Sequence, residues 1–294
     1  MAAIKIGVIG DLHTHWDEVD VAQFDASSYD LLYFVGDLGG GTPESTLRVA
    51  RTMSRLHKPA LVMPGNNDTV DVIELEAELG HQSGLAKLAG LKSAAPDTRP
   101  RAQLALCGYS LHRMIRNELD VTLVSARPHS MGGPELSFAE HMQRTYGVQT
   151  MQQSIDRLVA LVDDVASESI VFLAHNGPNG MGTEPDDMWG CDFKPGGGDW
   201  GDRDLAIAIQ HAQVRGKRIL AVVAGHMHLR TKGGAMRNWC TRHEGTLYIN
   251  AALVPRIFSG ADDVYRHHVA LTLTTDAAGA AAKAEEVLLP QSGA

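Results

Sequence analysis

Short apolar runs, each bounded by small or polar residues, recur along the chain and set its predicted architecture. Five runs rich in Val, Ile and Leu predict buried strands at 4–9, 31–35, 60–63, 170–174 and 219–224. Further strand-like runs cover 104–106, 121–125, 247–250, 269–274 and 286–289. Helical spacing of apolar residues predicts helices at 46–56, 71–79, 137–146, 151–166 and 204–215.

This alternation of strands and helices predicts one α/β domain over residues 1–294. A chain of 294 residues with 44% hydrophobic content can bury a large core, and α/β domains of this size are often single. The Ala-rich stretch 277–284 is predicted to be a loose connector before a last strand at 286–289, and the C-terminal tail is expected to be flexible.

Side chains that bind metal ions follow the ends of the five strand-like runs. Because open α/β sheets place their sites at the carboxyl ends of strands, we expect these side chains to converge. In extended backbone, residues i and i+2 project to the same side, which aligns Asp11 with His13 and His226 with His228. The five blocks are Asp11-Leu12-His13, Gly36-Asp37, Gly65-Asn66-Asn67-Asp68, His175-Asn176-Gly177 and Gly225-His226-Met227-His228.

The ligand types in these blocks predict a site for two metal ions. A carboxylate can bridge two cations through its two oxygens, imidazole suits transition metals, and an amide oxygen suits harder ions. Asp37 is therefore the expected bridge and Asn66 the expected amide ligand. These ligand types do not choose between Mn, which is our first expectation, and Fe, Zn or Ni.

The order DxH, GD, GNxD, H and GHxH over residues 11–228 resembles the calcineurin-like metallophosphoesterases. The resemblance implies two facing mixed β-sheets flanked by helices, in a four-layer sandwich. It also implies that one metal ion is held by Asp11, His13, Asp37 and His228, and the other by Asp37, Asn66, His175 and His226. Stretches that begin at Ala174, Gly196 and Tyr248 resemble a subgroup of the family, and Arg256, which ends the last of them, is a candidate for substrate binding.

One residue departs from the family pattern. Asn67 stands where the family usually has a His that donates a proton to the leaving oxygen, and an amide cannot supply that proton. General acid catalysis is worth ~10² to 10⁴ in rate, so its absence favours diesters with acidic leaving groups. We therefore predict a phosphodiesterase, with Asn67 as a candidate catalytic and substrate-binding residue. The alternatives are a phosphomonoesterase, a nuclease acting on short ends, and a metal-binding assembly scaffold on the same fold.

The predicted mechanism needs few other groups. Two cations about 3.5 to 4 Å apart lower the pKa of a bridging water, and the resulting hydroxide attacks phosphorus in line. Arg127 follows the run 121–125, and its guanidinium fork matches the geometry of a phosphate. His129 is a candidate to replace the missing proton donor. The alternatives are a salt-bridged Arg127 and a structural His129.

The segment 180–204 is rich in Asp and Gly and carries Trp189 and Trp200 without periodic apolar residues. A long segment of this kind, directly after His175, predicts a lid over the site, and an ordinary acidic surface loop is the alternative. Asp202 or Asp204 is expected to cap the helix that follows.

Composition narrows the possible partners and the cellular location. A net charge of -9 makes extensive nucleic-acid binding unlikely, so a small phosphate ester is the expected partner, while the oligomeric state stays open. Three cysteines without CxxC spacing indicate neither a disulfide framework nor a thiolate zinc site. No apolar run is long enough to span a bilayer, and no signal peptide is evident, which predicts a cytoplasmic protein without membrane association.

Overall fold

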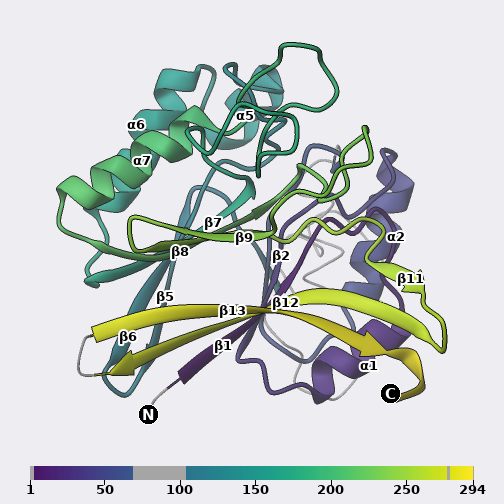
Figure 1. Cartoon of the computed structure of the whole chain (residues 1–294). Helices are drawn as coiled ribbons and strands as arrows, with labels where there is room; N and C mark the ends of the chain where they lie inside the picture. Colours follow the sequence, from purple (N-terminus) through teal and green to yellow (C-terminus); the bar gives the residue numbers. More distant parts are fainter. Residues whose placement is uncertain (1–2, 69–103, 277–278, 294) are drawn as a thin grey trace, which may run out of the picture.

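Two mixed β-sheets face each other and carry helices on their outer surfaces (Figure 1). The computed structural model describes residues 3–68, 104–276 and 279–293, so the helix expected at 71–79 lies outside the described residues. The arrangement confirms the predicted sandwich. Apolar residues from both sheets, such as Tyr33 from one and Val171 from the other, form a shared core between them.

The first sheet holds the strands that begin and end the chain. Its order is β11-β12-β1-β2-β3-β4, with β13 paired to β12. Strands β1 to β4 run parallel to one another, while β12 is antiparallel to β1 and to β13. The strands are β1 Ala3–Ile9, β2 Leu31–Phe34, β3 Ala60–Val62, β4 Leu104–Leu106, β11 Ile257–Ser259, β12 Val264–Asp276 and β13 Gly279–Pro290.

The second sheet is built from the middle of the chain, in the order β5-β6-β7-β8-β10-β9. Its four central strands are parallel, and an antiparallel strand closes each edge. The strands are β5 Ser110–Arg116, β6 Leu119–Ser125, β7 Ser169–Asn176, β8 Arg218–Gly225, β9 Cys240–His243 and β10 Thr246–Asn250.

Helices cover the outer face of each sheet. Helices α1 Glu18–Ala26 and α2 Pro43–Met53 pack on the first sheet, and α5 Ala139–Tyr146, α6 Met151–Asp163 and α7 Arg203–Val214 pack on the second. A short 3₁₀ helix, Gln291–Gly293, follows the last strand. Among the described residues, no helix is both long enough and apolar enough to cross a membrane.

The end of the chain differs from its prediction. Instead of a loose connector, β13 pairs with β12 from Gly279 to Pro290 and forms the long hairpin in yellow in Figure 1. Alanine is depleted in strands, so local propensity gave no sign of this pairing. Ala282 nonetheless packs into the core between the sheets. The loose connector was therefore a wrong prediction for residues 279–284, whereas the strand expected at 286–289 forms part of β13.

Candidate metal centre

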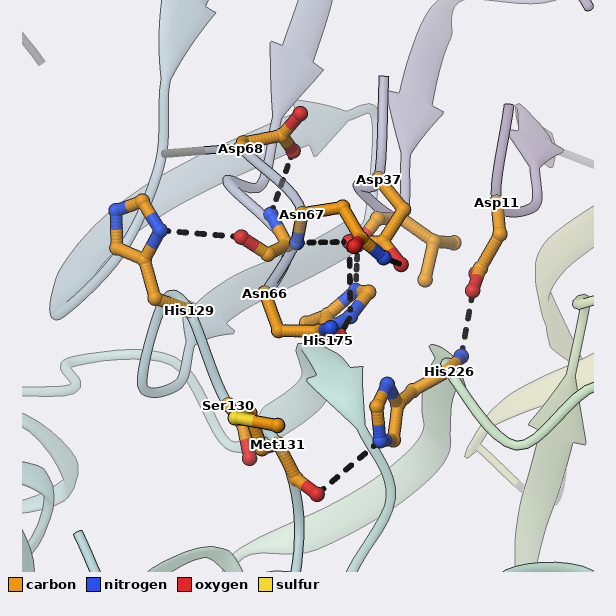
Figure 2. Close-up of polar contacts among 12 residues, drawn as sticks. Asp11, Asp37, Asn66, Asn67, Asp68, His129, Ser130, Met131, His175 and His226 are labelled. Carbon is orange, nitrogen blue, oxygen red and sulfur yellow. Dashed lines mark hydrogen bonds and ion pairs between the residues drawn. The ribbon is translucent and has the colours of Figure 1, made fainter. Parts of the chain in front are cut away.

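The carboxyl ends of five parallel strands, drawn from both sheets, bring the predicted ligands to one place. Figure 2 shows Asp11, Asp37, Asn66, His175 and His226 there. Three of these residues adopt positive φ, namely His13 at 41°, Asp37 at 49° and His226 at 66°. Such backbone costs of order 1–3 kcal/mol for a residue other than glycine, and it collects where function requires a side chain to be aimed. The positions after the strands are Asp11 and His13 for β1, Asp37 for β2, Asn66 for β3, His175 at the end of β7, and His226 and His228 for β8.

One ligand group consists of Asp11, His13 and His228, whose ligand atoms lie within 4.8 Å of one another. The Nε2 atoms of His13 and His228 are 3.1 Å apart. Asp11 Oδ2 lies 3.7 Å from His228 Nε2. This is the set that the sequence predicted for one metal ion, apart from the shared Asp37.

The other ligand group consists of Asp37, His175 and His226, again within 4.8 Å of one another. Asn66 joins it, because Asn66 Oδ1 lies 2.9 Å from His175 Nε2. Asp37 lies between the two groups: its Oδ1 is 3.5 Å from His175 Nε2, and its Oδ2 is 3.6 Å from His13 Nε2. One carboxylate therefore faces both candidate metal positions.

The hydrogen bonds around the ligands fit a cation. The Oδ2 atom of Asp11 is buried and lacks a hydrogen-bond partner among the described residues. His175 Nδ1 lies 2.9 Å from the Val35 carbonyl and can only donate to it, and its Nε2 lies 2.9 Å from Asn66 Oδ1. Burial acts to lower the pKa of His175, but Asp37 and Asp11 outweigh it and raise that pKa, so without a metal ion the ring can carry a second proton that Nε2 donates to Asn66. A backbone carbonyl on the second ring nitrogen is the usual support of a metal-binding His.

His226 is oriented in the same way. Its Nε2 donates to the Met131 carbonyl at 3.2 Å, so Nδ1 is left as the free acceptor (Figure 2). Burial lowers the pKa of His226 to about 3, so the ring is neutral at neutral pH, as a ligand must be.

The pKa values of the two buried aspartates, Asp11 and Asp37, are shifted in opposite directions. Burial raises the pKa of Asp11 to about 6. Burial also acts to raise the pKa of Asp37, but the nearby His175 and His226 outweigh it and hold that pKa below its ordinary value. An ionised, buried Asp11 next to Asp37 therefore calls for a positive charge in the site.

Asp68 supports the ligand loops, a role that the sequence analysis did not assign to it. Its Oδ1 accepts from Leu38 N at 2.9 Å and its Oδ2 from Gly65 N at 2.7 Å, so it ties the loop after β2 to the loop after β3. Gly65 must be glycine, because a Cβ there would lie 2.2 Å from Asp37 Oδ1. Asp68 ends the Gly-Asn-Asn-Asp block, which was the only signal available in the sequence.

Asn67 holds the shared carboxylate. Its backbone N donates to Asp37 Oδ1 at 2.8 Å, and its side-chain Nδ2 donates to Asp37 Oδ2 at 2.6 Å. Asn67 also lines a pocket of about 220 Å³ together with ligands of both groups. The residue that replaces the family's His is therefore placed at the site.

Arg127 needs a correction, because the structure places it in a buried ion-pair network. Its side chain is 1% exposed, with Nε donating to Asp204 at 2.8 Å and Nη2 to Asp202 at 2.9 Å. The Arg127 guanidinium group, which was expected to bind phosphate, thus binds two carboxylates. It connects the loop after β6 to the start of α7. Asp202 is the N-cap of α7 but makes no side-chain capping bond, since it accepts from Arg127 and Ser130 instead.

His129 and Arg256 also have structural surroundings. His129 is buried with Nδ1 3.1 Å from the Gly65 carbonyl, and burial lowers its pKa to about 3, which does not suit a proton donor at neutral pH. Arg256 is 1% exposed and donates from Nη1 to Asp20 at 2.9 Å and to the His15 carbonyl at 3.0 Å. Both residues were expected to act on substrate, but both are buried and their hydrogen bonds are to other parts of the protein.

The segment 180–204 borders the site, as expected from its position after His175. It is held at its base by the pairing of Pro178 with Asp202 and within by that of Gly190 with Asp199. Asp192 and Phe193 line the 220 Å³ pocket. That this segment opens and closes over the site stays a prediction.

Comparison with known proteins places this geometry in context. The sequence pattern of the calcineurin-like phosphoesterases matches residues 4–230. A dimetal phosphatase from Danio rerio has a similar structure, with 12% identity, a TM-score of 0.51 and coverage of 98% of this chain and 99% of that one. A protein of Thermus thermophilus matches with 11% identity, a TM-score of 0.51 and coverage of 91% and 94%. At these identities the likeness concerns the fold. No curated protein matches the chain.

Proposed function

The chain belongs to the calcineurin-like phosphoesterase family, and from this premise we propose that it is a phosphodiesterase that depends on two divalent metal ions. The observation that carries the proposal is the pair of ligand groups with Asp37 between them. Asp11 Oδ2, which has no hydrogen-bond partner among the described residues, and the closely placed His175 Nε2 and Asn66 Oδ1 support the binding of cations there. Manganese is the first ion to test, followed by iron, zinc and nickel.

The protein's own contribution is to hold the ligands in place. Two divalent ions bound there would lower the pKa of water and neutralise charge on the phosphate oxygens. His175 and His226 are oriented for this by the Val35 and Met131 carbonyls. Asn67 and Asp68 fix the loops that carry Asp37 and Asn66. His175, His226 and Asp37 are thus each held by a second group before any ion or substrate arrives.

The choice of diester over monoester rests on Asn67. A monoester with an alkyl leaving group needs a proton on the departing oxygen, and the Asn67 amide has none to transfer at neutral pH. Its Nδ2 is bonded to Asp37 instead. A diester with an acidic leaving group does not need this proton.

The test measures hydrolysis of bis(p-nitrophenyl) phosphate and of an alkyl phosphate monoester, with each of the four metals. We expect metal-dependent cleavage of the diester and much slower cleavage of the monoester. Lack of hydrolysis with every metal would refute the proposal and favour the scaffold alternative. Faster cleavage of the monoester would favour the phosphomonoesterase alternative.

Two variants separate the amide from the missing acid. Asn67→His restores the family's proton donor, so it is expected to raise the monoester rate relative to the diester rate, by up to ~10². Asn67→Ser is the matched control, because it removes the amide without adding an imidazole. Equal changes in both variants would show that the identity of residue 67 does not set the preference.

A further inference from the structure

The pocket at the metal centre has an outer wall whose chemistry differs from that of its inner wall. The inner wall consists of ligands of both groups and Asn67. The outer wall is contributed by two loops, the segment after β7 and the turn after β8. Its residues include Asp192, Phe193, Arg230 and Lys232.

The outer wall carries two basic side chains, Arg230 and Lys232. Arg230 and Lys232 are exposed, and neither forms an ion pair with a carboxylate in the described part of the chain. The one acidic residue of this wall, Asp192, is already paired: its Oδ1 lies 3.3 Å from Arg237 Nη2, and its Oδ2 accepts from Lys232 N at 2.7 Å. Two cations without an ion-pair partner among the described residues thus lie at the pocket of a chain whose net charge is -9.

Phe193 contacts one of these two cations, the Lys232 ammonium. Its ring is 44% exposed, and the Lys232 ammonium lies 5.6 Å from the ring centroid, within the range of a cation–π contact. The Phe193 ring in turn meets Trp200 edge to face at 5.2 Å. This contact places the Lys232 ammonium beside an aromatic residue that itself lines the pocket.

We propose that Arg230 and Lys232 form a subsite for a second anionic group of the substrate, so that the substrate is a phosphate ester that carries a further phosphate. This inference rests on the proposed function and names its substrate class. A singly charged diester would have its charge neutralised by the metal ions alone. Two further cations beside them match an additional phosphate, which guanidinium and ammonium groups bind through charge-assisted hydrogen bonds.

The test compares two p-nitrophenyl diesters of thymidine that differ only in a second phosphate on the other hydroxyl of the sugar. We expect kcat/KM to be higher for the substrate with the second phosphate, and the preference to decline as salt is added. In the double variant Arg230→Gln with Lys232→Gln, the preference is expected to fall by about 5- to 30-fold, as for the loss of one or two charge-assisted hydrogen bonds. The singly phosphorylated substrate should be cleaved at nearly the original rate.

The control variant is Arg144→Gln, which removes a positive charge from the exposed last turn of α5. It should leave the preference unchanged. Calorimetry with thymidine 5′-phosphate and thymidine 3′,5′-bisphosphate measures the same subsite by binding to the metal-loaded protein. If both diesters are cleaved but neither the preference nor the bisphosphate affinity changes in the double variant, the subsite is refuted while the phosphodiesterase stands. If neither diester is cleaved, the proposed function fails, and the calorimetry alone decides on the subsite.

Discussion

Replacing Asp11 with Asn should have opposite effects on stability in the absence and in the presence of metal. Asp11 is fully buried, its Oδ1 accepts from His226 N at 3.1 Å, and its Oδ2 has no hydrogen-bond partner among the described residues. An asparagine fits the same space without a negative charge. The metal-free protein therefore loses an unfavourable buried charge, whereas the metal-loaded protein loses a ligand.

The size of each effect follows from the burial of Asp11. Raising its pKa from 3.8 to about 6 corresponds to roughly 3 kcal/mol for keeping the folded protein's Asp11 ionised above that pH. The new amide N–H₂ would be an unsatisfied donor in place of Oδ2, which costs about 1–3 kcal/mol. The metal-free variant should thus be between equally stable and about 2 kcal/mol more stable than wild type at pH 8. An ion at 100 times its Kd stabilises the wild type by about 2.7 kcal/mol, most of which the variant forfeits.

The assay is urea denaturation at pH 8, once with a chelator and once with saturating Mn²⁺. The sign of the pH effect can be checked as well. An acid whose pKa is raised on folding destabilises the folded state above that pKa and has no such effect below the unfolded value. The advantage of metal-free Asp11→Asn should therefore disappear as the pH falls from about 6 to about 4.

A control identifies any general effect of removing a carboxylate. Asp120 is paired with Arg113 at the surface, so Asp120→Asn should change stability by less than about 1 kcal/mol, and equally with and without Mn²⁺. The reasoning would be wrong if Asp11→Asn lowered stability by the same amount in both conditions. Asp11 would then serve packing alone.

Three further changes test other parts of the structure. Gly177→Ala would place a Cβ 2.0 Å from the buried Trp189 ring, so unfolding in urea should show a loss of about 1–3 kcal/mol, and wild-type stability would contradict this contact. Burial lowers the pKa of His268 to about 3, so the free energy of unfolding should fall as the pH drops below 6.5, by about 2 kcal/mol at pH 5. His268→Gln should lessen this loss in acid titrations. An unchanged dependence of stability on pH would exclude His268 as its source. Asp20→Asn removes the carboxylate shared by two buried guanidinium groups, one of them on Arg256. The free energy of unfolding is expected to fall by about 3–5 kcal/mol in the same denaturation assay. A loss under about 1 kcal/mol would show that the ion pairs contribute little.

Much of the fold could be read from the apolar runs, and the missed strand β5 and the missed first half of β13 have a common origin. The runs at 4–9, 170–174 and 219–224 became β1, β7 and β8, because fully buried parallel strands need continuous apolar residues. The strand β5 has a mixed and largely exposed sequence, and β13 is rich in Ala, so neither shows this pattern. Both exist because they pair with a well-formed neighbour, β6 or β12.

The sequence by itself predicted the candidate ligands that the structure brings together, since side chains that directly follow buried parallel strands lie at the same edge of a sheet. It could not determine the partners of the buried arginines. Arg127 meets Asp202 across 75 positions, and Arg256 meets Asp20 across 236. Only tertiary structure decided that these guanidinium groups face carboxylates within the fold while Arg230 and Lys232 face the pocket. Local spacing specifies where a side chain leaves the backbone, but the charge that it meets comes from distant segments whose position depends on the packing of the whole molecule.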